Sequence, residues 1–194
     1  MDSTTQIDPE QRQGILAEIA DQGYELANIV EDLLVAARTE IGDLKVSRVP
    51  VNLKAQTAQV LETMRTTAGR SIQIEGDARF AIADPQRVRQ ILRNLVTNAN
   101  RYGGPEIVVA LRPASEGLVG IAVCDNGAGI PEEARDAIFD PYTRAHDRPG
   151  LTESFGLGLA ISRDLARLMG GDLIYTRTEL TEFRLLLPLD PERS

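Results

Sequence analysis

The chain is poor in the residue types that mark several classes of protein. It contains no tryptophan, only 4% aromatic residues, one cysteine and one histidine among its 194 residues. The single cysteine, Cys124, can form no disulfide within the chain and cannot build a thiolate metal site by itself. Its neighbours Ile121 and Val123 predict that it lies in a buried strand. The core must therefore be mainly aliphatic, and a hydrophobic content of 42% is enough to build one.

Long apolar runs and net positive charge are also missing. No stretch approaches the ~18 consecutive apolar residues of a membrane span, and no signal peptide is recognisable. The formal net charge is -8, which argues against a nucleic-acid partner because such partners require a broad basic face. We therefore expect a cytoplasmic protein with no nucleic-acid partner and no direct membrane contact. Whether a longer parent protein is anchored in a membrane stays open.

The first 42 residues of the chain predict a long amphipathic helix. Asp8 suits the N-cap and Pro9 the first helical position, and Gly42 is a plausible stop. One stripe repeats at steps of four and three, with a second apolar stripe beside it, which is the pattern of bundle helices. The stripe with steps of four and three consists of Ile15, Ile19, Gln22, Leu26, Ile29 and Leu33. We expect packing in a helical hairpin or against another molecule; folding back on the next domain is the alternative. The predicted domains are residues 1–42 and 43–194.

The remaining residues predict a mixed domain of the α+β class. Helices are expected at 52–68, 85–102 and 155–169. Strands are expected at 44–51, 71–75, 79–83, 106–112, 118–125, 172–176 and 182–187. This order favours a two-layer sandwich in which the helices lie on one face of a largely antiparallel sheet.

The segment Gln90–Tyr102, QILRNLVTNANRY, has one apolar and one polar helical face. The apolar face predicts core positions at Val88, Leu92, Leu95 and Ala99. Asn94, Asn98 and Arg101 project together from the other face. Carboxamide oxygens suit Mg2+, and an arginine can bind phosphate oxygens through its fork of donors. The polar face therefore indicates a site for a Mg-nucleoside triphosphate, with a plain solvated face as the alternative.

Two glycine-rich segments complete the predicted pocket. Asp125–Pro131, DNGAGIP, follows an apolar strand, so its carboxylate can accept a hydrogen bond from the amino group of adenine while glycines allow close approach. Phe155–Ile161, FGLGLAI, places glycines before a helix, whose free N–H groups favour phosphate. A tight turn and a packing loop are the respective alternatives. The polar run 143–154 between the two segments predicts a mobile lid, with a surface loop as its alternative.

With these blocks in this order, the chain resembles the ATP-binding catalytic domain of bacterial sensor histidine kinases. That domain belongs to a wider superfamily, called GHKL, which includes gyrase-type, heat-shock-chaperone and mismatch-repair ATPases. The resemblance covers about residues 45–189 and implies the Bergerat-type ATP-binding fold. QILRNLVTNANRY resembles the N box, DNGAGIP the first glycine box, IFDPY the F box and FGLGLAI the second glycine box. The helix over 9–41 resembles the second helix of the kinase dimerisation hairpin.

The resemblance implies a role for each pocket residue. Asn98 would bind Mg2+, while Asn94 and Arg101 would act in catalysis beside the metal and the phosphates. The lid residue Arg144 would reach phosphate. The phosphate end would be shaped by Gly156, Leu157 and Gly158. Asp125 would bind the adenine amino group, Tyr102 would line the adenine pocket, and Gly127 and Gly129 would shape it.

Three departures from the family pattern refine this expectation. Hydrolysing relatives carry a glutamate where Asn94 stands, so this chain lacks the base that activates water and fits transfer to a protein acceptor instead. Glu153 and Ser154 stand where the family has further glycines. The acceptor histidine is absent, and the only histidine, His146, lies in the predicted lid without the acceptor motif.

The resemblance therefore predicts a fragment that binds ATP and Mg2+ but does not autophosphorylate. In the longer protein it would form a homodimer, transfer the γ-phosphoryl group to a histidine and serve a response regulator. Two alternatives stay open at this point. One is a serine kinase of the anti-sigma-factor type, which generally lacks the long N-terminal helix. The other is a degenerate nucleotide-binding module used only for signalling.

Overall fold

The computed structural model describes residues 8–41, 44–68, 72–114, 117–141, 143 and 156–193. The chain divides into two compact units, residues 1–43 and 44–194. The described part of the first unit is dominated by one helix, α1 (Pro9–Glu40), which begins at the predicted proline. Large apolar side chains along it are 46–63% exposed: Ile15, Leu16, Ile19, Leu26, Val30, Leu33 and Leu34. No helix in the described ranges is both long and apolar enough to cross a membrane.

The second unit is built on a five-stranded sheet in the order β2-β4-β5-β7-β6. The strands are β2 (Gln73–Glu75), β4 (Ile107–Pro113), β5 (Leu118–Asp125), β6 (Asp172–Arg177) and β7 (Thr181–Pro188). The β2–β4 pair is parallel and the other pairs are antiparallel. A separate antiparallel pair joins β1 (Val49–Asn52) to β3 (Phe80–Ala83). The sheet is therefore largely antiparallel, as the sequence predicts.

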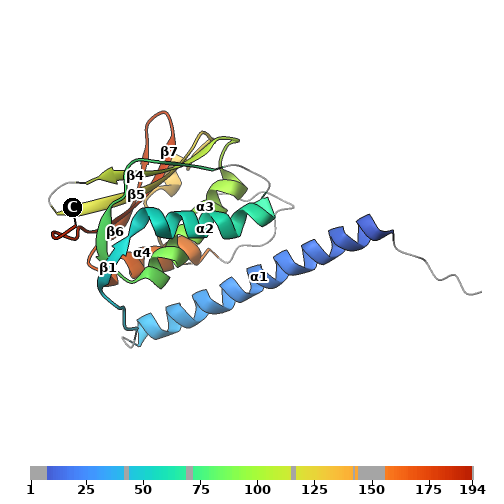
Figure 1. Ribbon diagram of the computed structural model, residues 1–194, viewed down its shortest axis with the longest axis horizontal. Coiled ribbons are helices and arrows are strands. Elements are labelled where there is room, and N and C mark those ends of the chain that lie inside the picture. The colour runs from blue at the N-terminus through green and yellow to red at the C-terminus, as the bar shows by residue number, and fades with distance from the viewer. Residues whose placement is uncertain are drawn as a thin grey trace, which may run out of the picture. The chain divides into compact units, whose positions relative to one another are not determined.

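Helices cover one face of this sheet, which gives the domain two layers (Figure 1). They are α2 (Leu53–Ala68), α3 (Pro85–Tyr102) and α4 (Gly158–Leu168), and a short 3-10 helix spans Glu132–Ala134. The core is aliphatic and draws on both layers, with fully buried side chains that include Ile91, Leu92, Leu95, Ile121, Leu165, Leu173 and Leu185. The four predicted core positions of α3 are all buried. The predicted α+β sandwich is confirmed.

Local signals explain where the central helices begin. Asp84 caps α3, because its Oδ1 accepts hydrogen bonds from the backbone N–H groups of Gln86 at 2.9 Å and Arg87 at 3.3 Å. Asn52 acts in the same way for α2, with its Oδ1 accepting from Ala55 N at 3.0 Å. Both side chains satisfy N–H groups that would otherwise lack partners in the first helical turn.

Three sequence predictions need correction. Residues 44–48 are not strand, because the backbone N–H of Ser47 donates to the Asp84 carboxylate and Arg48 donates to the carbonyl of Leu168. The predicted helix at 155–169 begins only at Gly158, because Gly156 has a φ of 67°, which is incompatible with a right-handed helix. The β1–β3 pair forms a second sheet that the sequence pattern did not predict.

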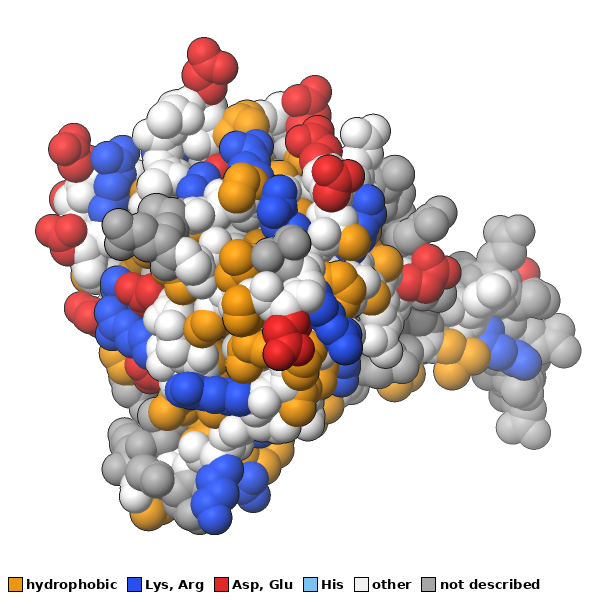
Figure 2. Space-filling model, turned by 60° about the vertical axis from the view of Figure 1, so that its left-hand side comes forward, with side chains coloured by type: hydrophobic (Ala, Val, Ile, Leu, Met, Phe, Trp, Pro, Cys, Tyr) orange, Lys and Arg blue, Asp and Glu red, His pale blue; other side chains and the backbone are white. Residues whose placement is uncertain are grey.

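The face drawn in Figure 2 shows how charge is arranged over part of the surface. Lysine and arginine side chains there stand among hydrophobic ones, while most of the acidic side chains stand toward the margin.

Candidate functional site

The carboxylate of Asp125 is buried at the end of β5 and held by backbone groups. Asp125 is only 6% exposed. Oδ1 accepts hydrogen bonds from Gly127 N at 2.8 Å and from Gly104 N at 3.3 Å. Within the described ranges no donor is bonded to the other oxygen, Oδ2. A fixed carboxylate with one oxygen available is the acceptor that an amino group on a flat ring requires.

Three glycines make this arrangement possible. A Cβ on Gly103 would lie 2.8 Å from the Asp125 carboxyl carbon, and one on Gly127 would lie 2.7 Å from its Oδ1. A Cβ on Gly104 would overlap the side chain of Asn126. Gly103 and Gly104 directly follow α3, so they bring the end of that helix, with Tyr102 as its last residue, against the start of the loop after β5.

The loop Gly127–Ile130 is held by the β6–β7 hairpin, a contact that sequence reasoning missed. Arg177 Nη1 donates to the carbonyl oxygen of Gly127 at 3.2 Å. The hydroxyl oxygen of Tyr175 accepts from Ile130 N at 3.1 Å. The alternation of β6 offered a signal, because Tyr175 and Arg177 share a face with the buried Leu173. What the sequence could not reveal is that this hairpin end lies beside the loop.

The predicted polar face of α3 meets the beginning of α4. Asn94 Nδ2 donates to Ser162 Oγ at 2.9 Å, and Ser162 is buried. A Cβ on Gly158 would lie 2.4 Å from Asn94 Oδ1, so only glycine allows the helix to start this close to the carboxamide. Asn94 therefore lies at the junction of the N box and the second glycine box. Ser162 was not identified from the sequence.

Asn98 and Arg101 follow Asn94 along the same half-buried face. The Asn98 carboxamide makes no hydrogen bond to any residue that the structure describes, so its oxygen can serve as a ligand. Arg101 lies in the last turn of α3. A carboxamide oxygen beside an anionic ligand fits Mg2+, which takes few protein ligands and completes its shell with water and phosphate oxygens.

The N-terminus of α4 has no side-chain cap. Leu157 occupies the N-cap position, and its side chain makes no capping hydrogen bond. Leu157 is itself buried, which fixes the first turn against the core. The N–H groups of the first turn of a helix carry partial positive charge and favour an anion when no side chain satisfies them. Gly156, Leu157 and Gly158 therefore adjoin an uncapped helix N-terminus, and their role at the phosphate end stays a prediction.

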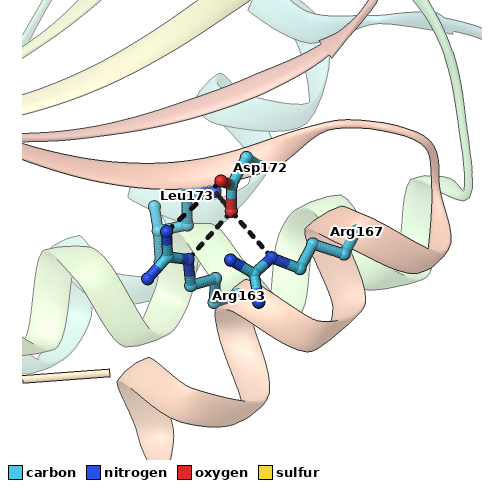
Figure 3. A network of polar contacts seen from close by, with 4 residues as sticks. All are labelled: Arg163, Arg167, Asp172 and Leu173. Carbon is cyan, nitrogen blue, oxygen red and sulfur yellow. Dashed lines mark hydrogen bonds and ion pairs between the residues drawn. The ribbon is translucent and has the colours of Figure 1, made fainter. Parts of the chain in front are cut away.

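An ion pair fixes α4 to the beginning of β6 (Figure 3). Arg163 donates to both oxygens of Asp172, at 2.9 and 3.3 Å, and Arg167 donates to Oδ1 at 3.2 Å. Partial burial alone would raise the pKa of Asp172, but the bonds from Arg163 and from Leu173 N outweigh it and lower the pKa below 3.8. The Arg163 guanidinium also lies 4.5 Å above the ring of Phe139 in the predicted F box.

Several predicted residues lie outside the described residues, so the structure does not place them. These are Arg144, His146, Glu153, Ser154 and Phe155, together with Tyr142 of the F box. The predicted lid over 143–154 consequently stays a prediction. The structure does place two parts of the predicted site. Asp125 contacts the loop that follows it, and Asn94 contacts the beginning of α4.

Comparisons with known proteins identify the family of this chain. The family described as "Histidine kinase-, DNA gyrase B-, and HSP90-like ATPase" matches residues 83–191. This match covers more than half of the chain, and the chain belongs to that family. Membership implies that the second unit binds ATP. The predicted resemblance to the catalytic domain of sensor histidine kinases is confirmed.

Individual relatives are sensor kinases. The sensor protein TorS of Escherichia coli is 34% identical over 185 residues, covering 90% of this chain and 20% of TorS. The signal transduction histidine-protein kinase AfsQ2 of Streptomyces coelicolor is 30% identical over 177 residues, covering 89% of this chain and 32% of AfsQ2. The structure of full-length ShkA in complex with AMPPNP superimposes with a TM-score of 0.73 at 28% identity, covering 98% of this chain and 41% of ShkA. The chain thus spans less than half of each relative.

Proposed function

We propose that this chain binds Mg-ATP between α3, α4 and the loop after β5, and supplies the phosphoryl donor in a two-component sensor kinase. In the longer protein, a histidine nitrogen attacks the γ-phosphorus. The bond from phosphorus to the β–γ bridging oxygen breaks, ADP leaves, and a response regulator then accepts the phosphoryl group. The observation that carries this proposal is the buried Asp125 carboxylate with one oxygen held by two backbone N–H groups. The AMPPNP bound in the ShkA structure supports the same ligand class.

Some pocket residues bind the adenine end of the nucleotide and others bind its phosphate end. Asp125 accepts the adenine amino group through Oδ2, and a guanine carbonyl at that point would be repelled. Tyr102 lines the ring, and the uncapped first turn of α4 receives the phosphates. Asn98 holds Mg2+, which neutralises phosphate charge when bound. Arg101 and the lid residue Arg144 add cationic contacts, and catalysis consists mainly of positioning and charge neutralisation.

Transfer rather than hydrolysis follows from the chemistry of Asn94. A carboxamide has no basic oxygen with which to take a proton from water. Its Nδ2 is moreover bonded to Ser162. The histidine-kinase relatives support this interpretation, and they give no support to the serine kinase of the anti-sigma-factor type. We propose that the full-length protein is a homodimer through α1.

A titration with and without metal tests the proposal. We expect a non-hydrolysable ATP analogue to bind at least ~10-fold more tightly with Mg2+ than with a chelator, since each factor of ten corresponds to ~1.4 kcal/mol. Asn98→Ala should abolish this difference while leaving the affinity in chelator unchanged. Loss of affinity in both conditions would contradict the assignment of Asn98 to the metal. Absence of binding by the parent chain would contradict the proposed function itself.

A further inference from the structure

We propose that Arg177, oriented by Thr181, is a positioning residue that holds the loop Gly127–Ile130 in the shape that binds adenine. No role in nucleotide binding follows for either residue from the four sequence motifs. The proposal rests on the proposed function, because it assigns Arg177 to the adenine end of that site. Its structural part, the fixing of the loop, holds with or without nucleotide.

The first observation is the set of bonds made by one guanidinium nitrogen. Arg177 Nη1 donates to Gly127 O at 3.2 Å and to Thr181 Oγ1 at 2.8 Å. Arg177 and Thr181 face each other directly across the β6–β7 pair, and Thr181 is only 3% exposed. The hydroxyl is therefore a fixed anchor for a long side chain that would otherwise sample many rotamers.

The second observation is that this half-buried cation has no acidic partner among the described residues. Its hydrogen bonds there run to two neutral oxygens, a carbonyl and a hydroxyl. Arg163 on α4, by contrast, is paired with the carboxylate of Asp172. Arg177 instead directs its charge at the backbone of the loop, and a charge-assisted bond of this kind is stronger than one between neutral groups.

The third observation explains a glycine of the DNGAGIP segment. Gly129 has a φ of 70°, and a Cβ there would overlap the Arg177 guanidinium. The glycine therefore makes room for Arg177 as well as adopting a left-handed conformation. Gly127, the first glycine of the motif, is required for a different reason, because it packs against Asp125 and Gly103.

These contacts connect Asp125, the proposed acceptor for adenine, to Arg177 through consecutive hydrogen bonds. Gly127 donates its N–H to Asp125 Oδ1 and accepts from Arg177 through its carbonyl, so one peptide segment joins both charged side chains. Three residues further on, the hydroxyl of Tyr175 fixes the end of the loop by accepting from Ile130 N. If the Arg177 bond is removed, the loop gains freedom and the binding of adenine must supply the cost of ordering it.

The test compares Arg177→Met, which keeps much of the side-chain length but removes every donor, with the parent chain. The matched control is Arg112→Met, which removes an exposed arginine on β4. Calorimetry would measure the affinity of each variant for ADP and for adenosine. Because the lost hydrogen bond is charge-assisted, we expect Arg177→Met to weaken the binding of both ligands by the same factor, on the order of tenfold. The control should bind both as the parent does.

Thr181 variants distinguish positioning from a general loss of stability. Thr181→Val removes the anchoring hydroxyl at nearly constant volume, and it should weaken adenosine binding by a smaller factor than Arg177→Met does. Thr181→Ser keeps a hydroxyl and should bind adenosine as the parent does. Adding Thr181→Val to Arg177→Met should cause no further loss, because both act through one contact. Parental adenosine affinity in Arg177→Met, or a loss confined to ligands with phosphates, would overturn the proposal.

Amide hydrogen exchange provides a readout that needs no nucleotide. In the free protein, Arg177→Met should speed exchange in the segment 126–130 by roughly tenfold while the core strand β5 keeps its protection. Unchanged exchange in that segment would overturn the proposal. A parent chain that fails to bind ADP would contradict the proposed function, and the exchange result would still decide the role of Arg177.

Discussion

Asn94 Nδ2 donates a 2.9 Å hydrogen bond to Ser162 Oγ, which ties the middle of α3 to the first turns of α4. The hydroxyl is buried, so no water competes for the contact. The bond leaves Asn94 Oδ1 directed at the start of α4, against Gly158. This pair of side chains thus adds a polar contact to the apolar packing between the two helices that carry the proposed metal and phosphate contacts.

Ser162→Ala should consequently impair the metal-dependent part of ATP binding. A neutral hydrogen bond contributes ~1 kcal/mol, so we expect a loss of about fivefold in affinity for the Mg-bound analogue and a smaller change for adenosine. Calorimetric titration of both ligands measures the difference. In an Asn94→Ala background the serine substitution should have no further effect. Equal losses for the two ligands would argue against a role at the phosphate end.

The Arg163–Asp172 ion pair predicts a stability that depends on pH. Its carboxylate has a pKa below the ordinary 3.8, so it stabilises the fold above that value and loses the contribution as the pH falls through the folded-state pKa. Because the pair is partly exposed, the contribution at pH 7 should be only ~0.5–1 kcal/mol.

Denaturant unfolding of the parent and of Asp172→Asn tests this prediction. The difference in unfolding free energy should be present at pH 7 and should shrink as the pH is lowered below 3.8. The exposed Asp164 on α4 offers a control substitution of the same kind, Asp164→Asn. A difference between parent and Asp172→Asn that grows toward low pH would have the wrong sign for this account.

Cys124 should be an unreactive thiol. Burial raises its pKa to about 11, with a further contribution from the negative charge of Glu182. Roughly one thiol in a thousand would then be ionised at pH 8, and only the thiolate reacts readily. We expect Ellman's reagent to modify the native chain at least ~100-fold more slowly than the chain unfolded in denaturant. Native labelling within tenfold of the unfolded rate would show that the thiol is neither buried nor suppressed.

The apolar face of α1 predicts self-association of the chain. An apolar stripe of this length is more than monomeric proteins ordinarily leave exposed, and its heptad spacing suits another helix. Sedimentation equilibrium should show mass rising with protein concentration, and Leu26→Glu combined with Leu33→Glu should reduce the effect. Gln13→Glu serves as the control on an already polar position. A parent that stays monomeric at high concentration would contradict the prediction.

Sequence reasoning succeeded where a local pattern decides the structure. The strand Leu118–Asp125 was predicted with its observed bounds, because a continuous apolar run leads directly to a carboxylate and a glycine turn. Asp84 directly precedes Pro85, a pattern typical of a helix start, and the structure shows its bonds to the helix N–H groups. The burial of Cys124 is likewise confirmed.

Contacts between distant segments were not predictable in this way. The strand expected over 44–51 was shortened because Ser47 bonds to Asp84, which is 37 residues away. Ser162 and Arg177 belong to no motif, and their importance depends on which chain segments the fold brings beside Asn94 and Gly127. Strand alternation places Arg177 on the same face as the buried Leu173, but the local sequence does not reveal its partners, which are a carbonyl 50 residues away and a hydroxyl on the next strand.

The most direct test of the proposed function is calorimetric titration of ADP into the parent chain and into Asp125→Asn. The asparagine keeps an Oδ1 that can accept from Gly127 and Gly104, but it replaces the ligand-facing oxygen by an amide donor. Loss of a charged acceptor corresponds to ~1.5–3 kcal/mol, so the account predicts binding by the parent and a loss of roughly 10- to 150-fold in the variant. Asp164→Asn should bind as the parent does. Equal affinity in the parent and Asp125→Asn would contradict the adenine site described here.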